Sequence, residues 1–545
     1  MGALQTICRQ LILYTSLRTV LVFTLVVMVI FMIFQTFRGK QRKNLPPGPW
    51  GLPILGCLPY LGRDAHVVLT RWAKTYGDVY SVRFGTVPVV VLNGFGVIKE
   101  ALVKHGVDFA GRPDLFTFRT PHHRGLRYKG ILVENYDRQL EERRHYTMRL
   151  FRVLGVGRTN LESAIFKSQL EVLMKDLTNT GGKAIDIFPI LRDSVANITL
   201  GIIFGFRLVH NDPQYEGILD TVHKMYELNT KLNVVNFVPF LEKLPLPVLK
   251  EFDEVSTRLV LQVIAWFKGQ ENNKHVDSNH MKSFANWYKT DVLKYKQYEM
   301  DEKVTLKEND KKPALNDSIQ ANGQEKDVKL DSIFSENQII SVAIDLFMAG
   351  FETVTTTLRW GFLYMALHPE IQAKVQEEID SNLGDQNPSI TDKGALPYTE
   401  ATIMEIQRLN YVLPLAVPHS TTTDVEFHDY TIPKDTMVLV NLWSVMTDPV
   451  CWPNPDKFDP QRHLNERGRT IRHDVFTPFS LGKRSCVGAA LARMELFLFF
   501  TSLMQKFTFR LPDGASAPVF EEGTLASTFS PPYHQLCVVS RGPKT

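Results

Sequence analysis

Residues 479–488 read Phe479-Ser480-Leu481-Gly482-Lys483-Arg484-Ser485-Cys486-Val487-Gly488, a glycine-containing loop that leads a cysteine into the start of a helix. Unpaired backbone N–H groups and the positive end of the helix lower the pKa of a thiol there and favour the thiolate. Gly482 and Gly488 allow a flat ligand to approach the backbone, and Arg484 can pair with an anionic group. A single cysteine is usually just a small buried apolar residue. The prediction of a ligand-binding loop therefore rests on the whole pattern F-x-x-G-x-R-x-C-x-G.

This pattern resembles the haem-binding loop of the cytochromes P-450, and the resemblance covers nearly the whole chain from Leu45 onward. It implies haem b as cofactor, with Cys486 as the metal ligand through an axial thiolate. Phe479, Arg484 and Gly488 are then cofactor-binding residues. The implied fold is mainly α with small β sheets (α+β), the cytochrome P-450 fold, with a long central helix over the haem.

The long helix can be located in the sequence. Ser335 and Gln338 form a capping-box pattern, and apolar residues continue at helical spacing to His368-Pro369, where proline ends the helix. Such a helix is roughly 50 Å long. The segment Ala349-Gly350-Phe351-Glu352-Thr353 lies midway along it.

This segment resembles the family's oxygen-activation motif. A glycine inside a helix costs about 1 kcal/mol, so a compensating role is expected. The resemblance implies that Thr353 and Glu352 are catalytic, handling protons during oxygen activation, and that Ala349 leaves room beside the cofactor. The alternative is a threonine that bonds back to its own helix, with a solvated glutamate.

Glu405-Ile406-Gln407-Arg408 places an acid and a base three residues apart, on one face of a helix. Taken alone, this is a surface ion pair. It looks like the family's E-x-x-R motif, which implies a structural role together with Arg462 in Phe458-Asp459-Pro460-Gln461-Arg462.

The carboxylates of a haem require cations. By family position Arg143, Arg484 and His419 look like these partners, with Arg127 as a further candidate. The family commonly has W-x-x-x-R on the helix that carries Arg143, whereas this chain has Gln139 at the tryptophan position. An amide can still hydrogen-bond a carboxylate.

Other elements follow from the apolar spacing and the prolines. Helices are expected over 369–383 and 397–408, and from just after Cys486 to about Phe507. Strands are expected at Val425 to Tyr430 and Met437 to Val440. The polar segment 298–331 is predicted to be a mobile loop insertion, with a charged partner-binding helix as the alternative.

The N-terminal segment predicts a membrane anchor. Nineteen residues, Thr19 to Phe37, carry no charge, and as a helix they span about 28 Å. Four basic residues follow by Lys43, which keeps the rest of the chain cytoplasmic. We expect residues 1–44 to form a single-pass anchor of the endoplasmic reticulum membrane and 45–545 to form the catalytic domain. The alternatives are a cleaved signal peptide and a buried helix of a soluble protein.

The composition excludes some partners. A net charge of +4 over 545 residues argues against nucleic acid. The five cysteines are scattered, without the spacing of a disulfide framework or a zinc site. No nucleotide-binding glycine motif is present, so electrons must come from a partner. The resemblance implies NADPH-cytochrome P-450 reductase, with cytochrome b5 as a further candidate. Arg143, Arg144, Arg149, Arg152 and Lys483 are predicted to form the docking face, the alternative being a solvated basic helix.

Three stretches are similar to the microsomal second family and look closest to its subfamily U: residues 399–405, 441–445 and 494–499. The resemblance implies an O2- and NADPH-dependent monooxygenase that hydroxylates a lipophilic substrate, and for subfamily U a long-chain fatty acid at or next to its terminal carbon. A steroid or xenobiotic hydroxylase, a haem-thiolate isomerase and a non-enzymatic haem sensor are the alternatives. Glu352 and Thr353 argue against the isomerase, and the lack of an output domain argues against the sensor.

Overall fold

The structure is a computed structural model that describes residues 18–30, 44–119, 130–207, 213–269, 283–290, 335–518, 523–525 and 528–542. Two sequence-based predictions, the polar insertion at 298–331 and the role of Arg127, lie outside these residues.

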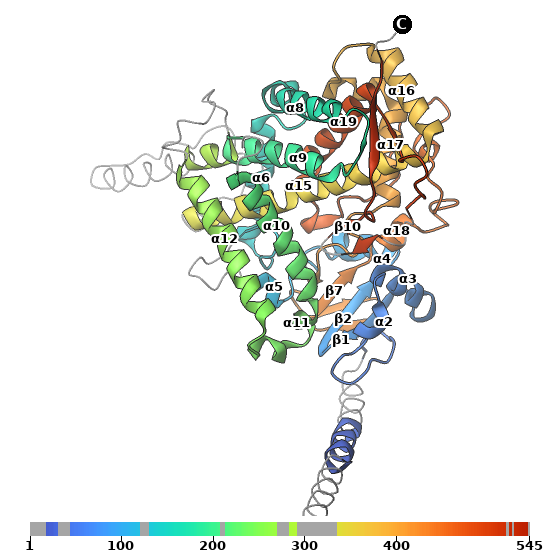
Figure 1. The fold of residues 1–545 in the computed structure, drawn as a ribbon. Helices are drawn as coiled ribbons and strands as arrows, with labels where there is room; N and C mark the ends of the chain where they lie inside the picture. The colour runs from blue at the N-terminus through green and yellow to red at the C-terminus, as the bar shows by residue number, and fades with distance from the viewer. Residues whose placement is uncertain are drawn as a thin grey trace, which may run out of the picture.

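The first part of the globule carries a hairpin and then a run of helices that surround the middle of the molecule (Figure 1). The elements are α2 (Leu58–Leu61), α3 (Ala65–Tyr76), β1 (Val79–Phe84), β2 (Val87–Leu92), α4 (Phe95–Lys99), the π-helix η1 (Glu100–Lys104), α5 (Phe116–Arg119), α6 (Arg138–Leu154), α7 (Thr159–Leu161), the π-helix η3 (Glu162–Phe166), α8 (Lys167–Asn179), β3 (Ala184–Ile185), α9 (Phe188–Phe204), α10 (Pro213–Lys231), α11 (Asn233–Phe237), the 3-10 helix η4 (Pro239–Lys243) and α12 (Pro247–Gly269).

The second part begins with the longest helix and adds the remaining strands. Its elements are α15 (Glu336–Leu367), α16 (Pro369–Leu383), η5 (Ile390–Ala395), α17 (Pro397–Leu409), β4 (His419–Ser420), β5 (Val425–Phe427), β6 (Tyr430–Ile432), β7 (Met437–Val440), α18 (Trp443–Met446), η6 (Pro460–His463), η7 (Gly482–Arg484), α19 (Ala489–Lys506), β8 (Phe507–Arg510), β9 (Thr524–Leu525), β10 (Phe529–Ser530) and β11 (Leu536–Ser540).

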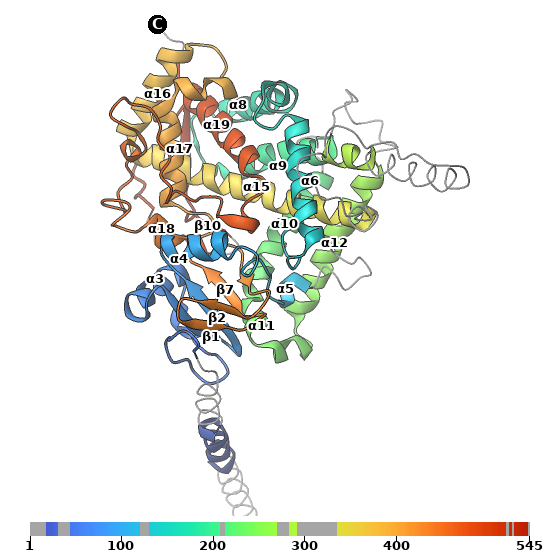
Figure 2. The same ribbon diagram turned by 180° about the vertical axis from the view of Figure 1, so that it is seen from behind.

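The helix α15 crosses the middle of the helical part, with α9 beside it in both views (Figures 1 and 2). Its N-terminus has the predicted capping box of Ser335 and Gln338, and it ends at His368. Phe347, Trp360 and Leu363 are buried in the main hydrophobic core around it. Among the described residues this is the one helix that is long and apolar enough to cross a membrane, and most of it is buried inside the globule.

The largest sheet lies to one side of the helices and has the strand order β1-β2-β7-β4. β1 and β2 pair antiparallel as a hairpin, whereas β2 and β7 pair in parallel, with Val90 opposite Val438. The nearly continuous apolar run of β2 suits a strand covered on both faces. A three-stranded sheet, β3-β11-β8, and two strand pairs complete the small β content.

The predicted fold class, mainly α with small β sheets, is confirmed. Helices α16 and α17 and strand β7 match the predicted segments within one residue. The short strands predicted around Val425 to Tyr430 are present as the antiparallel hairpin β5–β6, in which the chain turns after Phe427. His428 lies in this turn with φ 53°, a left-handed conformation that ends the first strand.

The described part of the N-terminal segment is a short apolar helix, Arg18–Ile30. Its apolar side chains, from Val20 to Ile30, are exposed. The rest of the predicted anchor lies outside the described residues.

Candidate active site

Cys486 lies between η7 and α19, in a loop that closes on itself. Its backbone N–H donates to the carbonyl of Phe479 at 3.0 Å. Gly482 has φ +71°, and a Cβ there would lie 1.8 Å from the Leu102 carbonyl oxygen. This glycine is therefore required by packing on η1, not by a flat ligand as predicted. At Gly488 the nearest atom to an added Cβ is the Cys486 sulfur, at 3.9 Å, so space beside the sulfur is open.

Cys486 lines a cavity and is accessible from it, although many protein atoms surround its thiol. Burial raises its pKa, while the Gly488 N–H and the charges of Arg144 and Arg493 lower it. The net direction is opposite to the sequence-based expectation of a lowered thiol pKa, because desolvation outweighs the loop amides and the nearby cations. A coordinated metal ion supplies the missing positive charge and deprotonates a thiol outright.

The cavity above Cys486 has apolar walls with polar groups at a few places. The α15 wall contains Leu346, Ala349, Thr353 and Val354, and the opposite wall includes Leu413 and Val417. Phe479 and Val487 line the cavity beside the sulfur. Such a cavity suits a large flat apolar group and a lipophilic molecule above it.

Three arginines and a histidine gather at one end of this cavity, namely Arg112, Arg144, Arg484 and His419. Burial and mutual repulsion lower the pKa of Arg112, and that of Arg484 falls to about 9 for the same two reasons, burial and Arg144. No ion pair among the described residues involves any of the three arginines. Buried cations brought close together without an ion pair among the described residues favour the binding of an anion.

The structure brings Arg144 to this cavity, not Arg143. The Arg144 guanidinium lines it and donates to the Ser485 carbonyl next to the cysteine. Arg143 is only 2% exposed and lies outside the cavity lining, and its three guanidinium nitrogens have no hydrogen-bond partner among the described residues. The prediction that Arg143 pairs with a haem carboxylate, with Gln139 four residues before it, stays a prediction.

His419 lies at the same end of the cavity, on β4. Its Nδ1 is 2.7 Å from the Phe109 carbonyl oxygen, which can only accept, so Nδ1 carries a proton. Burial and the charge of Arg112 lower the imidazole pKa.

The two catalytic candidates on α15 have different surroundings. Thr353 lines the cavity, and its hydroxyl donates to the Ala349 carbonyl at 2.9 Å. This is the back-bonding that we set out as the alternative, but the hydroxyl oxygen keeps lone pairs that can accept a bond from the cavity. Ala349 lines the cavity as predicted. Gly350 instead makes room for α9, because its Cβ would lie 3.0 Å from a methyl group of Thr199.

Glu352 lies outside the cavity lining. Burial raises its pKa, while the charges of His223, Arg359 and Arg192 lower it. His223 belongs to α10 and Arg192 to α9, so the carboxyl of Glu352 lies near both helices, one residue from a threonine that lines the cavity.

Two cavity residues were missed by sequence reasoning. Neither Arg112 nor Asp345 was given a role on the basis of the sequence. Asp345 lies one turn before Ala349, and burial raises its pKa to about 7 against the lowering effect of bonds from Leu132 and Ile131. An acid inside the apolar run of a core helix was the signal that could have identified it.

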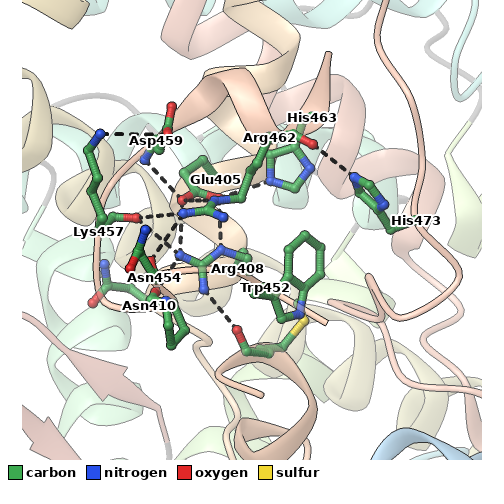
Figure 3. Close-up of polar contacts among 12 residues, drawn as sticks. Glu405, Arg408, Asn410, Trp452, Asn454, Lys457, Asp459, Arg462, His463 and His473 are labelled. Atoms are coloured by element: carbon green, nitrogen blue, oxygen red, sulfur yellow. Dashed lines mark hydrogen bonds and ion pairs between the residues drawn. The ribbon is translucent and has the colours of Figure 1, made fainter. Parts of the chain in front are cut away.

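The E-x-x-R pair forms a buried polar network with residues of the 452–463 segment (Figure 3). Arg408 donates from Nε and Nη2 to the two Glu405 oxygens at 2.8 and 2.9 Å, and Arg462 Nε donates to Glu405 at 2.9 Å. His463 Nε2, which the sequence did not indicate, contacts the same carboxylate at 3.0 Å. Bonds from the cations lower the Glu405 pKa overall. Arg408 also donates to the Met446 and Pro455 carbonyls, so the pair fixes the chain that leads to the cysteine loop.

The predicted docking face is smaller than expected. Of its α6 arginines only Arg149 and Arg152 are exposed, whereas Arg143 and Arg144 are buried. Lys483 is partly exposed and forms an ion pair with Glu141 at 2.6 Å. The inclusion of all four arginines in one surface patch was therefore wrong, because two of them lie on the inner face of the helix.

The geometry defines a haem-thiolate class of site: a cysteine loop below an apolar cavity, crossed by one long helix and anchored on a buried E-x-x-R pair. The chain matches the family model "Cytochrome P450" over residues 46–538. It is 34% identical to Cytochrome P450 2U1 of Rattus norvegicus over 529 residues, covering 92% of each chain. It is also 34% identical to Cytochrome P450 2J2 of Homo sapiens, with 94% of each covered. Its identity to Cytochrome P450 2C23 of Rattus norvegicus is 36%, with 92% of this chain and 94% of the relative covered.

The chain therefore belongs to the cytochrome P450 family, and its relatives are members of the second family, subfamily U among them. It is a monooxygenase that uses haem b with a cysteine thiolate ligand, molecular oxygen and electrons derived from NADPH. Its reaction requires a redox partner and a lipophilic substrate. The cavity fits the haem, because open space adjoins the Cys486 sulfur and three buried arginines that form no ion pair among the described residues line the same cavity.

Proposed function

We propose that Cys486 is the thiolate ligand of the haem iron and that the enzyme hydroxylates long-chain fatty acids at or next to the terminal carbon. The observation that carries the proposal is the position of the Cys486 sulfur, in a cavity whose α15 wall presents Thr353 among apolar side chains. A haem bound there supplies the activation of oxygen, to which the thiolate contributes electron density.

The side chains around the cavity divide the remaining work. Arg112, Arg144 and Arg484 hold the haem carboxylates by charge-assisted hydrogen bonds, with His419 beside them. The apolar walls exclude water and align the chain of the substrate. The Glu352 carboxyl, whose pKa burial raises, would pass protons toward the cavity, and the Thr353 oxygen keeps lone pairs that can accept a hydrogen bond there.

The choice of fatty acid rests on the likeness to subfamily U, and the apolar walls suit it. The same walls also suit a steroid or a xenobiotic, which are the second candidates. The presence of Thr353 in the cavity wall argues against an isomerase.

We propose that residues 1–44 anchor the protein in the endoplasmic reticulum membrane, with residues 45–545 as a cytoplasmic catalytic domain. The exposed apolar helix Arg18–Ile30 supports this. A second exposed apolar surface includes Trp50, Ile54 and Phe240. The segment with Trp50 and Ile54 and the segment with Phe240 both contact the β1–β2 turn. Gly85 N–H in this turn donates to the Leu55 carbonyl, and Thr86 N–H donates to the Phe237 carbonyl, both at 3.0 Å.

We further propose that NADPH-cytochrome P-450 reductase docks on the surface that includes Arg149 and Arg152, with cytochrome b5 as a second partner.

Replacing Cys486 by histidine or alanine tests the central assignment. Both variants should lose the carbon-monoxide band of the reduced protein that thiolate donation causes. Cys451→Ser is the matched control, because Cys451 is a partly buried cysteine outside the cavity lining. Retention of the band in Cys486→Ala would show that another residue binds the iron. Spectral shifts with a panel of fatty acids, steroids and xenobiotics then decide the substrate class.

A further inference from the structure

The segment 131–134 has no regular secondary structure, yet it lies against the cavity between α15 and the arginine cluster. Backbone N–H and C=O groups buried in such a segment need partners. In segment 131–134 the N–H groups of two residues bond to Asp345 on α15, and three carbonyl groups accept from Arg112 and Arg484.

The N–H groups bond to α15. Ile131 N–H donates to Asp345 Oδ2 at 2.6 Å, and Leu132 N–H donates to the same oxygen at 2.9 Å. A Cβ at Gly130 would lie 2.1 Å from this oxygen. Gly130 therefore has no room for a side chain as long as the Asp345 carboxylate keeps its position.

The carbonyl groups accept from the arginines. Arg112 Nε donates to the Leu132 carbonyl at 2.9 Å, while Arg484 donates from Nη1 to the Ile131 carbonyl at 3.3 Å and from Nη2 to the Glu134 carbonyl at 2.5 Å. Arg112 is held further by the Pro418 carbonyl at 2.9 Å. Two of the three cations at the haem end thus take their orientation from segment 131–134.

We propose that Asp345 is a positioning residue for the haem: its carboxylate fixes segment 131–134, whose carbonyl groups aim Arg112 and Arg484 at the haem carboxylates. Asp345 acts through the backbone and makes no contact with the haem in this scheme. The proposal rests on the assignment of Arg112 and Arg484 to the haem carboxylates under the proposed function. It adds a coupling between the α15 wall of the substrate cavity and the cationic end of the haem site.

Two substitutions break the contact from opposite sides. Asp345→Leu removes the acceptor at similar volume, and Gly130→Ala leaves Asp345 in the chain but places a methyl group where its oxygen lies. Asp345→Asn keeps an acceptor oxygen and should rescue most of the loss. Ser341→Ala is the matched control, because Ser341 is a buried polar residue one turn away on α15 whose hydroxyl donates to the Asn337 carbonyl of its own helix.

Haem transfer to an excess of apomyoglobin measures how firmly the cofactor is held, and the propionate bending band in the resonance Raman spectrum reports hydrogen bonding to its carboxylates. Asp345→Leu and Gly130→Ala should release haem about tenfold faster and shift the band, while Asp345→Asn and Ser341→Ala stay close to the wild type. If Asp345→Leu does not fold, Gly130→Ala alone decides. A band and release rate equal to those of Ser341→Ala would overturn the proposal.

Arg112→Leu separates this inference from the proposed function. If Arg112→Leu shifts the band and speeds release but Gly130→Ala does neither, Asp345 has no positioning role and the arginine assignment survives. If Arg112→Leu changes neither quantity, the assignment of Arg112 to a haem carboxylate fails, and the positioning role of Asp345 fails with it.

Discussion

Arg143 and Arg144 are neighbours on α6, and both are buried, but their guanidinium groups have different surroundings. Arg144 lines the cavity and bonds to the chain next to Cys486. Arg143 has no hydrogen-bond partner among the described residues, and burial lowers its pKa against the charges of Asp137 and Glu134. A buried cation without a partner is destabilising. Substitutions of Arg143 and Arg144 can therefore be compared directly for their effects on haem binding and on stability.

Arg144→Leu should release haem about tenfold faster than the wild type, because a charge-assisted bond is lost at the haem site. Arg143→Leu should retain haem and raise the denaturant midpoint, since it removes a desolvated charge that has no hydrogen-bond partner among the described residues. Haem transfer to apomyoglobin and urea unfolding of both variants check this. Faster release from Arg143→Leu, together with normal release from Arg144→Leu, would show that Arg143 is the arginine that holds a haem carboxylate.

The site residues that could be predicted are those whose pattern is local. Cys486, the E-x-x-R pair and Thr353 each stand in a short motif. Arg144 was wrongly placed on the docking surface because the side of α6 that faces the core depends on how the helix packs, which is a tertiary property. Asp345 and His463 were missed because their partners are distant in the sequence: Asp345 bonds to residues 131 and 132, and His463 to Glu405.

At the scale of elements, helices with a proline or a capping box at the start were predicted well, because these signals lie within the first turn. The start of α15 at the Ser335 cap and that of α16 at Pro369 are examples. The sheet was not predicted, because β2 pairs with β7 more than three hundred residues later in the chain. No local pattern specifies such a partner.

Helix α3 illustrates how such long-range packing changes the chemistry of a residue. His66 on α3 is buried between the rings of Trp443 and Phe529, at centroid distances of 4.7 and 5.5 Å. Burial lowers its pKa from 6.5 to about 4, with Asp64 opposing the shift. The imidazole is therefore neutral in the folded protein at pH values where the unfolded chain binds a proton.

Between pH 6.5 and 4 the unfolded chain carries more protons at this site than the folded protein, so the free energy of unfolding falls as the pH falls. Between pH 7 and pH 5, the neutral His66 lowers the free energy of unfolding by about 2 kcal/mol. Replacing it in His66→Phe should reduce the loss of stability between pH 7 and pH 5 by about this amount. Urea midpoints at the two pH values measure the difference. Equal losses in wild type and variant would mean that His66 does not stay neutral in the folded protein.

At the scale of the whole molecule, charged and apolar surfaces are placed on different elements. The exposed apolar residues near Trp50 and Phe240 belong to the N-terminal segment and to the region after α11. The exposed arginines Arg149 and Arg152 lie on α6, whose inner face bonds through Arg144 to the cysteine loop. A partner bound to the exposed arginines of α6 would be separated from the cysteine loop by this one helix. The exposed apolar residues near Trp50 and Phe240 would not be covered by that partner.

Charge reversal of Arg149 and Arg152 to glutamate should therefore raise the apparent KM for reductase while leaving the haem seated. Exposed charges act by steering, which salt screens over about 8–10 Å, so the difference from wild type should shrink as salt rises. Arg71→Glu with Arg258→Glu, on α3 and α12, makes the same change in net charge on other exposed surfaces and should leave KM unchanged. Oxidation driven by added peroxide needs no reductase and should be nearly normal in both double variants. If peroxide-driven and reductase-driven rates of the α6 variant fall by the same factor, the substitutions have damaged the haem site, and α6 is not the docking surface.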